Sequence, residues 1–474
     1  MSMGRKNEPQ QERMWLETSN VQSGPGHPYY TRFEELLQKH DCDRVIEGMC
    51  AEFYAETTGR PSIPPGVYFR LLMIGYLEGI DSERGIAWRV SDSLGLRKFL
   101  GYSVDERTPD HSSMSRIRRR IDLETHRKIF NWVLGILAKE DLLKGKTLGV
   151  DATTLEASAA MRNLVRRDTG EGYDEFLTGL AKASGIETPT RADLARIDKK
   201  RPKKGSNKDW KSPIDSDARV AKMKDGRTHL AHKAEQVVDM ETCAVVAVTL
   251  QHADLGDTAT LPVSLSATTE NILAVGDDAD AGKNMSPNLL CELVGDKGYH
   301  SSAVLLKLDE LGFRSHVSEP DRGARHWDGK EAERDATYAN RRRVSSERGK
   351  VLQRMRGEVL ERAHAHLYET GRMRRTHLRH HPNILKRLLF HVCAFNLSLV
   401  MRKNFRIGTP RGLQGLLDAI FSLLRALLAT GEAIHGFAAH IVAPKSPLAP
   451  NLTPRAGFQT ENWPGGIGPF STGC

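Results

Sequence analysis

Two short apolar runs, far apart in the chain, each end in an aspartate. Leu148–Asp151 and Leu293–Asp296 both place apolar or glycine residues directly before the acid. Apolar runs of this kind are typical of buried strands. An ionised carboxylate at the end of such a strand is costly unless a cation or hydrogen-bond donors compensate it. The pattern therefore predicts two strand ends whose charges need a partner.

A third acidic position follows in a helix-like segment that is dense in arginine. It holds Glu358 and Glu361, which are three residues apart and so share one face of a helix. Three carboxylates brought together from distant positions form an oxygen-rich site of the kind that Mg²⁺ or Mn²⁺ prefers. Two such ions can clamp the attacking and leaving oxygens of a phosphodiester displacement. We therefore predict that Asp151, Asp296 and one of the two glutamates converge on a two-metal site.

The distribution of charge suits a polyanionic partner. The chain of 474 residues has a formal net charge of +9. Between Arg341 and Arg406 there are seventeen lysines and arginines against four glutamates and no aspartate. This block overlaps the third acidic position, which suits a site that must hold a phosphate backbone. The alternative is a basic helix surface that is merely solvated.

Cysteine usage and hydropathy bear on the compartment. The six cysteines form no Cys-x-x-Cys pair, so neither a zinc site nor a disulfide framework is indicated and a reducing compartment is expected. The polar start of the chain lacks the apolar core of a signal peptide. The most apolar late run, Leu413–Leu428, contains Asp418 and Arg425 and is too short to span a bilayer comfortably. We expect a cytoplasmic protein without a membrane segment.

The first third of the chain has helical periodicity. Residues 1–27 are expected to form a flexible leader, and residues 28–142 a helical domain. A strongly basic helix within it carries Arg116, Arg118 and Arg119, and is expected to continue through Leu137. Arginines near a helix N-terminus favour phosphate, so this helix is a candidate DNA contact. The alternative is a basic surface helix that contacts nothing specific.

The remainder predicts a mixed α/β sheet with helices packed on it. Apolar runs predict strands at 147–157, 234–238, 244–250, 290–296 and 313–317. A further apolar run after Ser301 predicts a helix. A polar insertion spans about residues 161–226. From Leu352 the pattern stays helical through Leu399. The catalytic-looking domain is thus expected at 143–410, followed by a C-terminal helix and a disordered tail at 411–474.

Histidines late in the chain do not by themselves predict a zinc site. His364 and His366 are two apart, which directs them to different faces of a helix. His380 and His381 precede Pro382 in an expected loop. Because no cysteine or acid stands at ligand spacing from them, surface or stacking roles are favoured.

Several segments together resemble the DDE transposases of bacterial insertion sequences. Val150–Thr153 resembles the family's first aspartate strand, and Gly295–Tyr299 resembles its Gly-Asp-x-Gly-Tyr motif. Arg356–Arg362 resembles the segment around its glutamate. Three further segments match, namely Leu367–Gly371, Ala394–Leu397 and, before the catalytic core, Pro109–Arg116. The resemblance covers roughly residues 28–412.

The resemblance implies a fold, a metal site and a reaction. The fold would be an RNase H-like core with an N-terminal helical domain, and the site a triad of Asp151, Asp296 and a glutamate that holds two Mg²⁺ or Mn²⁺ ions. The reaction would be cleavage of DNA at terminal inverted repeats and strand transfer to target DNA. A metal nuclease that does not join ends, or a catalytically defective DNA-binding regulator, is the alternative. Pairing of two DNA ends suggests at least a homodimer, placed in the bacterial cytoplasm at the nucleoid.

The identity of the third acid stays open between two residues. The family pattern is Tyr, two residues, Arg, three residues, Glu, six residues, Lys. With Glu361 as the acid, none of the three flanking positions matches; with Glu358, Arg354 falls on the arginine but the other two positions do not match. Glu361 is preferred because Arg362 and the spacing to Leu367–Gly371 fit one branch of the family. The missing lysine leaves Arg362 or Arg354 as the expected phosphate contact.

Overall fold

The computed structural model of the chain describes residues 26–55, 62–201, 205–223, 226–321, 323 and 325–412. The described residues all lie within one compact unit, whose bounds are Met1–Gly415. The leader predicted at 1–27 and the C-terminal helix and tail predicted at 411–474 therefore fall almost wholly outside the described residues, where nothing tests them.

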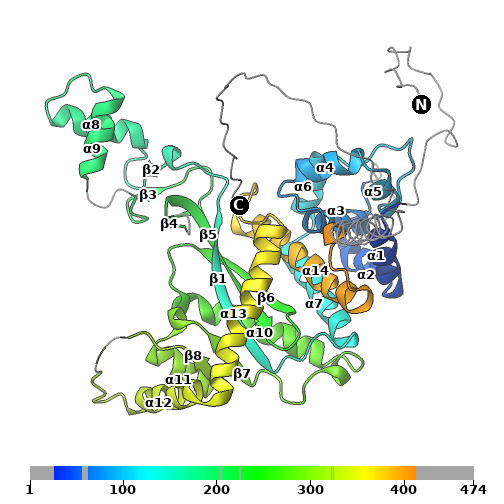
Figure 1. Cartoon of the computed structure of the whole chain (residues 1–474). Helices are drawn as coiled ribbons and strands as arrows, with labels where there is room; N and C mark the ends of the chain where they lie inside the picture. Colours follow the sequence, from blue (N-terminus) through cyan, green and yellow to red (C-terminus); the bar gives the residue numbers. More distant parts are fainter. Residues whose placement is uncertain are drawn as a thin grey trace, which may run out of the picture. The chain divides into compact units, whose positions relative to one another are not determined.

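Helices form the described chain up to the first strand (Figure 1). In chain order they are α1 (Pro28–Lys39), α2 (Cys42–Cys50), the 3₁₀ turn η2 (Ala51–Phe53), α3 (Pro65–Leu77), α4 (Glu83–Ser91), α5 (Leu94–Phe99), α6 (His111–Arg120) and α7 (Leu123–Lys139). The N-terminal helical region predicted from the sequence is confirmed.

The prediction that the basic helix runs on to Leu137 is wrong, because the chain breaks between α6 and α7. Ile121 has an extended backbone, with φ −79° and ψ 130°. Asp122 then caps α7, since its side chain accepts the backbone N–H of Thr125 at 2.8 Å. A capping aspartate satisfies one of the free N–H groups at a helix start, which favours a new helix over a continuous one.

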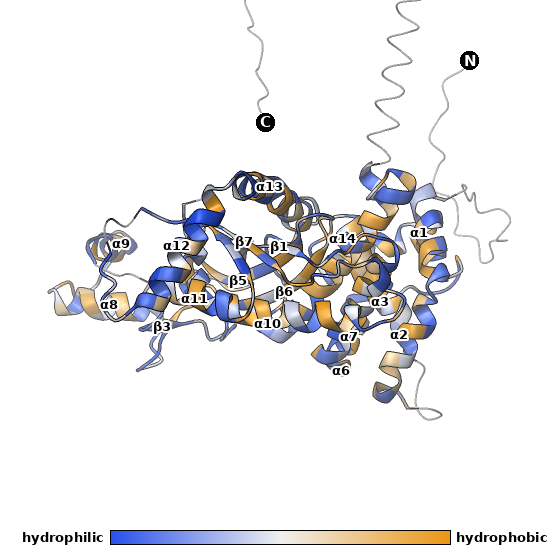
Figure 2. Ribbon diagram, turned by 90° about the horizontal axis from the view of Figure 1, so that it is seen from below, coloured by the Kyte–Doolittle hydropathy of each residue, from blue (hydrophilic) through white to orange (hydrophobic). Residues whose placement is uncertain are grey.

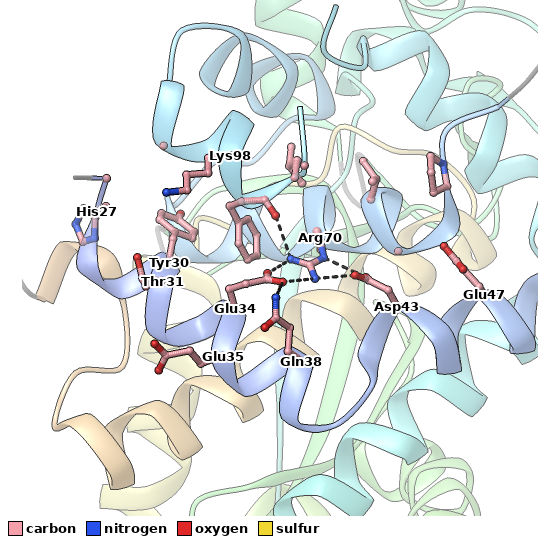
Figure 3. Close-up of a pocket in the computed structure, with 18 residues that line it drawn as sticks. His27, Tyr30, Thr31, Glu34, Glu35, Gln38, Asp43, Glu47, Arg70 and Lys98 are labelled. Carbon is pink, nitrogen blue, oxygen red and sulfur yellow. Dashed lines mark hydrogen bonds and ion pairs between the residues drawn. The ribbon is translucent and has the colours of Figure 1, made fainter. Parts of the chain in front are cut away.

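A buried arginine ties the first helices together (Figure 3). Arg70 of α3 is 5% exposed and pairs with Glu34 of α1 and Asp43 of α2, the latter at 2.8 Å. It also donates to the Phe99 carbonyl at the end of α5, at 3.0 Å. Burial disfavours the charge, but hydrogen bonds to the two carboxylates raise the pKa of Arg70 above its usual value. One guanidinium thereby connects four helices.

A central mixed sheet follows the helices. Its strands are β1 (Thr147–Glu156), β4 (Arg219–Lys222), β5 (Thr228–Asp239), β6 (Val245–His252), β7 (Glu292–Gly295) and β8 (Arg314–Val317), in the order β4-β5-β1-β7-β8 with β6 also paired to β5. β5 runs antiparallel to β1, β4 and β6, whereas β1, β7 and β8 are parallel. The expected mixed α/β sheet is confirmed.

Helices cover both faces of this sheet (Figure 2). α13 (Glu347–His364) lies on one face, and α10 (Asp257–Gly276) and α11 (Ser302–Glu310) lie on the other. Gly149 of β1 faces α13, since an added Cβ would lie 3.3 Å from Leu360 of that helix and 2.5 Å from Met240 Sδ. Side chains alternate along a strand, so Asp151 and Thr153 share this face with Gly149.

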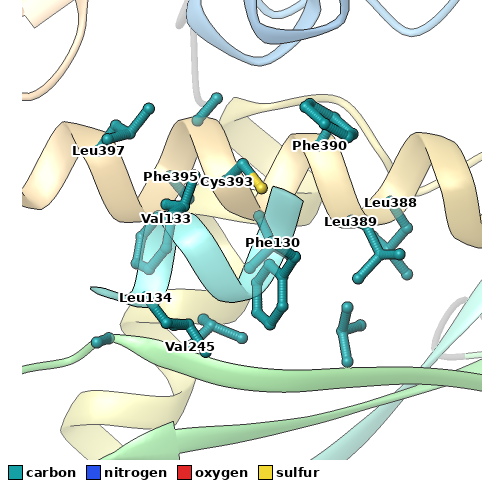
Figure 4. Packing of buried hydrophobic residues seen from close by; sticks show 14 of the residues in the cluster. Phe130, Val133, Leu134, Val245, Leu388, Leu389, Phe390, Cys393, Phe395 and Leu397 are labelled. Atoms are coloured by element: carbon teal, nitrogen blue, oxygen red, sulfur yellow. The ribbon is translucent and has the colours of Figure 1, made fainter. Parts of the chain in front are cut away.

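A long apolar helix, α14 (His381–Phe405), packs against α7 and β6 to form much of the core (Figure 4). Asn396 of α14 extends the pairing of β6: its side-chain amide donates to the Val245 carbonyl at 2.9 Å and accepts the Val245 N–H at 3.0 Å. The segment His381–Gly412 is long and apolar enough to cross a membrane, but its most apolar part is entirely buried in the protein. Core helices pass the same test, so this is weak support for a membrane span.

The polar insertion is more ordered than its composition indicates. Between β1 and β5 it contains η3 (Met161–Asn163), β2 (Val165–Arg166), α8 (Tyr173–Ala183), α9 (Arg191–Lys200), β3 (Trp210–Lys211) and β4. A small second core holds Ala157, Leu164, Trp210, Ala218 and Leu230. Burying a tryptophan and its apolar neighbours supplies the driving force for this local order.

Other elements differ from the sequence prediction or were not foreseen. Two helices and two short turns were not predicted, because their sequences lack a clear apolar pattern. They are α10, α12 (Glu331–Ser345), η4 (Gly282–Asn284) and η5 (Lys297–Tyr299). The helix from Leu352 is interrupted after the π-helical turn η6 (Ala365–Thr370), so its predicted continuity through Leu399 is wrong. Arg372 and His380, which flank the break, both have positive φ angles, which a continuous helix does not allow.

An ion pair between the exposed Arg348 and the buried Glu292 fixes the start of α13 to the sheet, and its loss should destabilise the fold. Glu292 of β7 is 3% exposed, accepts from Arg348 Nε at 2.8 Å and accepts from Thr147 Oγ1 at 2.8 Å. We expect Arg348→Ala to lower the free energy of unfolding by about 1–3 kcal/mol, because it leaves a buried carboxylate poorly paired. Urea denaturation measures this.

The same pair predicts a pH dependence. The hydrogen bond from Arg348 lowers the pKa of Glu292 to about 2. Because the folded value lies below the usual value near 4.5, the stabilisation is present above pH 4.5 and is lost as the pH falls towards 2. The difference in unfolding free energy between the parent and Arg348→Ala should therefore shrink over that range. An unchanged difference at pH 3 would contradict this role.

Candidate active site

The two aspartates belong to neighbouring parallel strands, Asp296 directly after β7 and Asp151 within β1. The prediction that Asp151 ends its strand is wrong, because antiparallel pairing with β5 continues β1 to Glu156. The register of β1 and β7 pairs Thr147 with Glu292 and Gly149 with Val294. Continued by two residues, it brings Asp151 level with Asp296, and adjacent strands are about 4.8 Å apart. Gly295 confirms this closeness, since an added Cβ there would lie 3.5 Å from Val150 Cγ1. The fold therefore brings together two acids that are far apart in sequence.

Asp151 lies beneath the end of α13. Its side chain is 24% exposed, and its Oδ2 lies 3.5 Å from Nδ1 of His364, the last residue of that helix. Gln236 stands directly opposite Asp151 on β5 and so points to the same face. Its amide is fully buried, and neither amide atom has a hydrogen-bond partner among the described residues. Unsatisfied polar atoms beside a partly exposed acid fit a site that is completed by a ligand.

Asp296 lies beside a further acid. Its Oδ1 accepts the Gly298 N–H at 2.8 Å, at the start of η5. An added Cβ on Gly298 would lie 3.0 Å from this oxygen and would overlap the carboxylate of Asp257, the first residue of α10. Asp257 Oδ1 in turn accepts from the nearly buried Lys233 Nζ at 2.6 Å. Glycine is therefore required here, where two carboxylates approach the backbone.

A buried polar network supports the face of the sheet opposite α13. Glu235 of β5 is fully buried and accepts from Tyr299 at 2.9 Å, from Thr260 at 2.8 Å and from Ser264. Burial raises the pKa of Glu235, while these hydrogen bonds oppose the rise. Tyr299 is 1% exposed and belongs to the core.

The two candidate glutamates lie on α13, and both are exposed. Neither side chain forms a hydrogen bond or an ion pair with another described residue, although both backbones belong to the helix. Glu361 lies three residues before His364, and residues three apart on a helix are neighbours, with Cβ atoms about 5–6 Å apart. Glu358 lies six residues before His364, about 120° around the helix axis. Because His364 touches Asp151, helix geometry favours Glu361 as the nearer acid.

The basic residues selected from the sequence have different surroundings. Arg116 and Arg119 are exposed on α6, and Arg354 and Arg362 are exposed on α13. Arg118 differs: it is 8% exposed, pairs with Glu83 of α4 and donates to Ser115 at 3.1 Å. Its guanidinium is thus engaged within the helical region, and its placement does not favour a DNA contact.

Sequence reasoning passed over His364, Gln236, Lys233 and Glu235 as parts of this site. A signal was present, since Lys233, Glu235 and Gln236 interrupt an apolar strand. Charged and amide residues inside a buried strand need partners, so they mark a polar site. The sequence does not show that their strand, β5, pairs with the strand of Asp151, or in which register.

Comparison with known proteins gives one match. Residues 21–120 match the family model described as Transposase domain (DUF772), which spans α1 to α6. No curated protein and no solved structure matches the chain. The match supports a transposase of the insertion-sequence type, and it implies a function in transposition and an interaction with DNA.

The Glu235 network should contribute measurably to stability. Tyr299→Phe removes one donor from a buried carboxylate, and we expect it to lower the free energy of unfolding by about 1–3 kcal/mol. Tyr338→Phe is the control, since Tyr338 is 42% exposed, and it should have little effect. Urea denaturation of both variants measures the difference; equal stabilities would show that the Tyr299 hydroxyl is not needed.

Proposed function

We propose that the protein is a DDE transposase that cleaves DNA at the terminal inverted repeats of an insertion sequence and joins the ends to target DNA. One observation carries the proposal: β1 and β7 are neighbouring parallel strands, and their register, continued by two residues, brings Asp151 within β1 level with Asp296 directly after β7. The transposase-domain match at residues 21–120 supports it independently, because that match does not include either aspartate.

The arrangement of strands supports an RNase H-like core. The strand that bears the first acid is central, with the antiparallel β5 and β6 on one side and the parallel β7 and β8 on the other. A helix with the candidate third acid crosses this sheet. We assign residues 143–410 to this catalytic part and residues 28–142 to DNA binding.

The donor set suits two Mg²⁺ or Mn²⁺ ions. Asp151, Asp296 and Glu361 would hold them, since carboxylate oxygens are the ligands that these ions prefer. When bound, the ions supply activation of a water or a 3′-hydroxyl and stabilisation of the leaving oxygen. The orphaned amide of Gln236 beside Asp151 fits a site that binds a further group.

The surrounding side chains orient this site. His364 lies against the Asp151 carboxylate and limits its rotation. Lys233 neutralises Asp257, which reduces the repulsion that Asp257 would exert on Asp296. Arg374 donates to Thr153 Oγ1 at 2.8 Å, on the face of β1 that carries Asp151. Its guanidinium also pairs with Glu369, so Arg354 and Arg362 remain the candidates for the phosphate contact that the family's lysine otherwise provides.

The partners follow from the same proposal. They are double-stranded DNA with terminal inverted repeats, the target DNA and a second copy of the chain, since two DNA ends must be paired. We place this activity in the bacterial cytoplasm at the nucleoid.

Substitution of the acids tests the chemistry. We expect Asp151→Asn and Asp296→Asn each to reduce cleavage of an inverted-repeat fragment in Mn²⁺ by about a thousandfold or more, with DNA binding retained, because electrostatic stabilisation of the reacting phosphate is lost. Glu361→Gln should behave likewise, whereas Glu358→Gln, matched in residue type and exposure, should remain active. The reverse outcome for the glutamates would reassign the third acid to Glu358.

The products of the same assay separate three functions. Joined products indicate a transposase, hydrolysis alone indicates a nuclease without joining activity, and binding without cleavage indicates a defective regulator. Full activity of Asp151→Asn would remove the site assignment.

The basic helix α6 provides a separate test of DNA binding. We expect Arg116→Ala combined with Arg119→Ala to weaken binding and to lower the slope of log affinity against log salt by about 1–2, because up to two phosphate contacts are lost. Arg118→Ala should instead lower stability, since it breaks the pair with Glu83. Binding titrations at several salt concentrations and thermal unfolding measure both. An unchanged salt slope in the double variant would exclude α6 from the DNA surface.

A further inference from the structure

A short basic segment connects the π-helical turn η6 to α14. This connector, residues 371–380, contains four arginines and two histidines but no acidic residue. Met373 and Thr376 are each 1% exposed and hold it against the protein. Other side chains of the connector face solvent, namely Arg372, Arg375, His377, Arg379 and His380. The connector is thus packed on one side and presents positive charge on the other.

Backbone hydrogen bonds fix the connector to the strand that bears Asp151. Glu156 of β1 donates its N–H to the Arg374 carbonyl at 2.9 Å, and its own carbonyl accepts the Thr376 N–H at 2.9 Å. β5 occupies the other edge of β1 along this stretch. The connector therefore continues the edge of β1 that β7 occupies before Asp151.

One side chain of the connector reaches the face of the candidate active site. Arg374 Nη1 donates to Thr153 Oγ1 at 2.8 Å, and Glu369 pairs with the same guanidinium. Thr153 lies two residues after Asp151 on the same face of β1, a separation of about 7 Å along the strand. Arg374 is therefore an anchor, and the connector runs past the candidate active site at short range.

The connector also borders the helical region. His377 Nε2 lies 3.2 Å from Oδ2 of Asp81, which precedes α4. A cleft of about 430 Å³ lies between the connector and the first turns of α4 and α6. Its polar lining includes Ser82, Arg84, His111, Ser115, Thr376 and His377. The connector thus links the basic helix α6 to the strand that bears Asp151.

The positive charge around this cleft is only partly compensated. Asp81 and Glu83 also line the cleft, but each is already paired with a cation of the protein. Three exposed arginines of the cleft and the connector have no ion pair with any described residue, namely Arg84, Arg372 and Arg379. Exposed cations without acidic partners attract a polyanion, and each DNA strand presents a phosphate charge about every 3.4 Å.

We propose that the connector and the start of α4 bind the phosphate backbone of double-stranded DNA between α6 and the candidate active site. Arg372 and Arg379 contact phosphates from the connector, and Arg84 contacts one from α4. Phosphate contacts fix the register of a protein on DNA without reading its sequence, so this surface sets which phosphate meets Asp151. This placement rests on the proposed function, since it takes DNA as the substrate of the acids.

DNA binding by the full-length chain tests this surface. The parent carries Asp151→Asn, so that it binds an inverted-repeat fragment without cleaving it. We expect Arg372→Ala combined with Arg379→Ala to weaken binding and to lower the slope of log affinity against log salt by about 1–2, because two phosphate contacts are lost. Arg379→Lys should keep the slope of the parent, since lysine retains the charge. Titrations at several salt concentrations measure these slopes.

A second pair of arginines supplies the matched control. Arg314 on β8 and Arg342 on α12 are exposed, and β7 separates β8 from the strand of Asp151. Arg314→Ala combined with Arg342→Ala removes the same charge and should bind as the parent does. Arg379→Gln alone leaves Arg372, whose φ is 56°, unchanged and should lower the salt slope by about 1. Thermal unfolding of each variant checks that the fold is retained.

Phosphate ethylation interference locates the contacts on the DNA. Ethyl groups on the phosphates that the connector binds should weaken binding of the parent, but should not weaken binding of the Arg372→Ala, Arg379→Ala chain any further. Because the connector runs close to Asp151, these phosphates should lie within one helical turn, about 34 Å, of the end of the inverted repeat.

Three results would overturn the assignment. They are an unchanged salt slope in the connector variants, an equal loss in the control pair, and interfering phosphates that lie only beyond that helical turn. All three are compatible with cleavage by the unsubstituted chain, which would leave the proposed function intact. Conversely, a chain whose binding depends on the connector but that never cleaves DNA would support this surface and count against the proposed active site.

Discussion

The parallel pairing of β1 with β7 is the constraint on which the site depends. It joins a strand near residue 150 to one near residue 294, and its register brings Asp151 and Asp296 to the same level. α13 can cross this pair closely because Gly149 presents no side chain to Leu360. The ion pair between Arg348 and Glu292 fixes the start of the same helix to β7. A shift of one residue in this register would turn Asp151 to the opposite face, so strand pairing and helix docking together decide whether the proposed metal site can form.

The opposite face of the sheet shows how the fold carries a charge in its core. Glu235 is fully buried and is satisfied by hydroxyl groups of α10 and by Tyr299. The buried face of α10 therefore carries hydroxyl groups, although the sequence of this helix has no clear apolar stripe. These residues are Thr260, Ser264 and Thr268. Such a network is stabilising only when every member is satisfied, and it supports β5, which pairs directly with the strand that bears Asp151.

The positive charges of the chain serve two purposes. Arg70, Arg118 and Arg387 are buried and connect helices through carboxylates or backbone carbonyls. Arg116 and Arg119 on α6, with Arg354 and Arg362 on α13, remain exposed. A count of basic residues therefore overstates the surface that can meet a phosphate backbone, and burial is needed to separate the two groups.

The sequence by itself determined the two strands near the aspartates, the helical region before them and the resemblance to DDE transposases, because apolar periodicity and short motifs are local properties. It did not show that β1 continues past Asp151, because that continuation depends on pairing with β5. It could not choose between Glu358 and Glu361, since the family pattern fits neither; contact of His364 with Asp151 favours the latter. It also gave no sign that residues 371–380 lie along β1, because that contact depends on where the chain runs between η6 and α14. The sequence did not predict α10, because the serine and threonine residues on its buried face give no apolar pattern. Their hydroxyl groups face inward because they donate hydrogen bonds to the buried Glu235. Only the tertiary structure decides which distant polar groups share a dry environment, and that environment is what makes them reactive or binding.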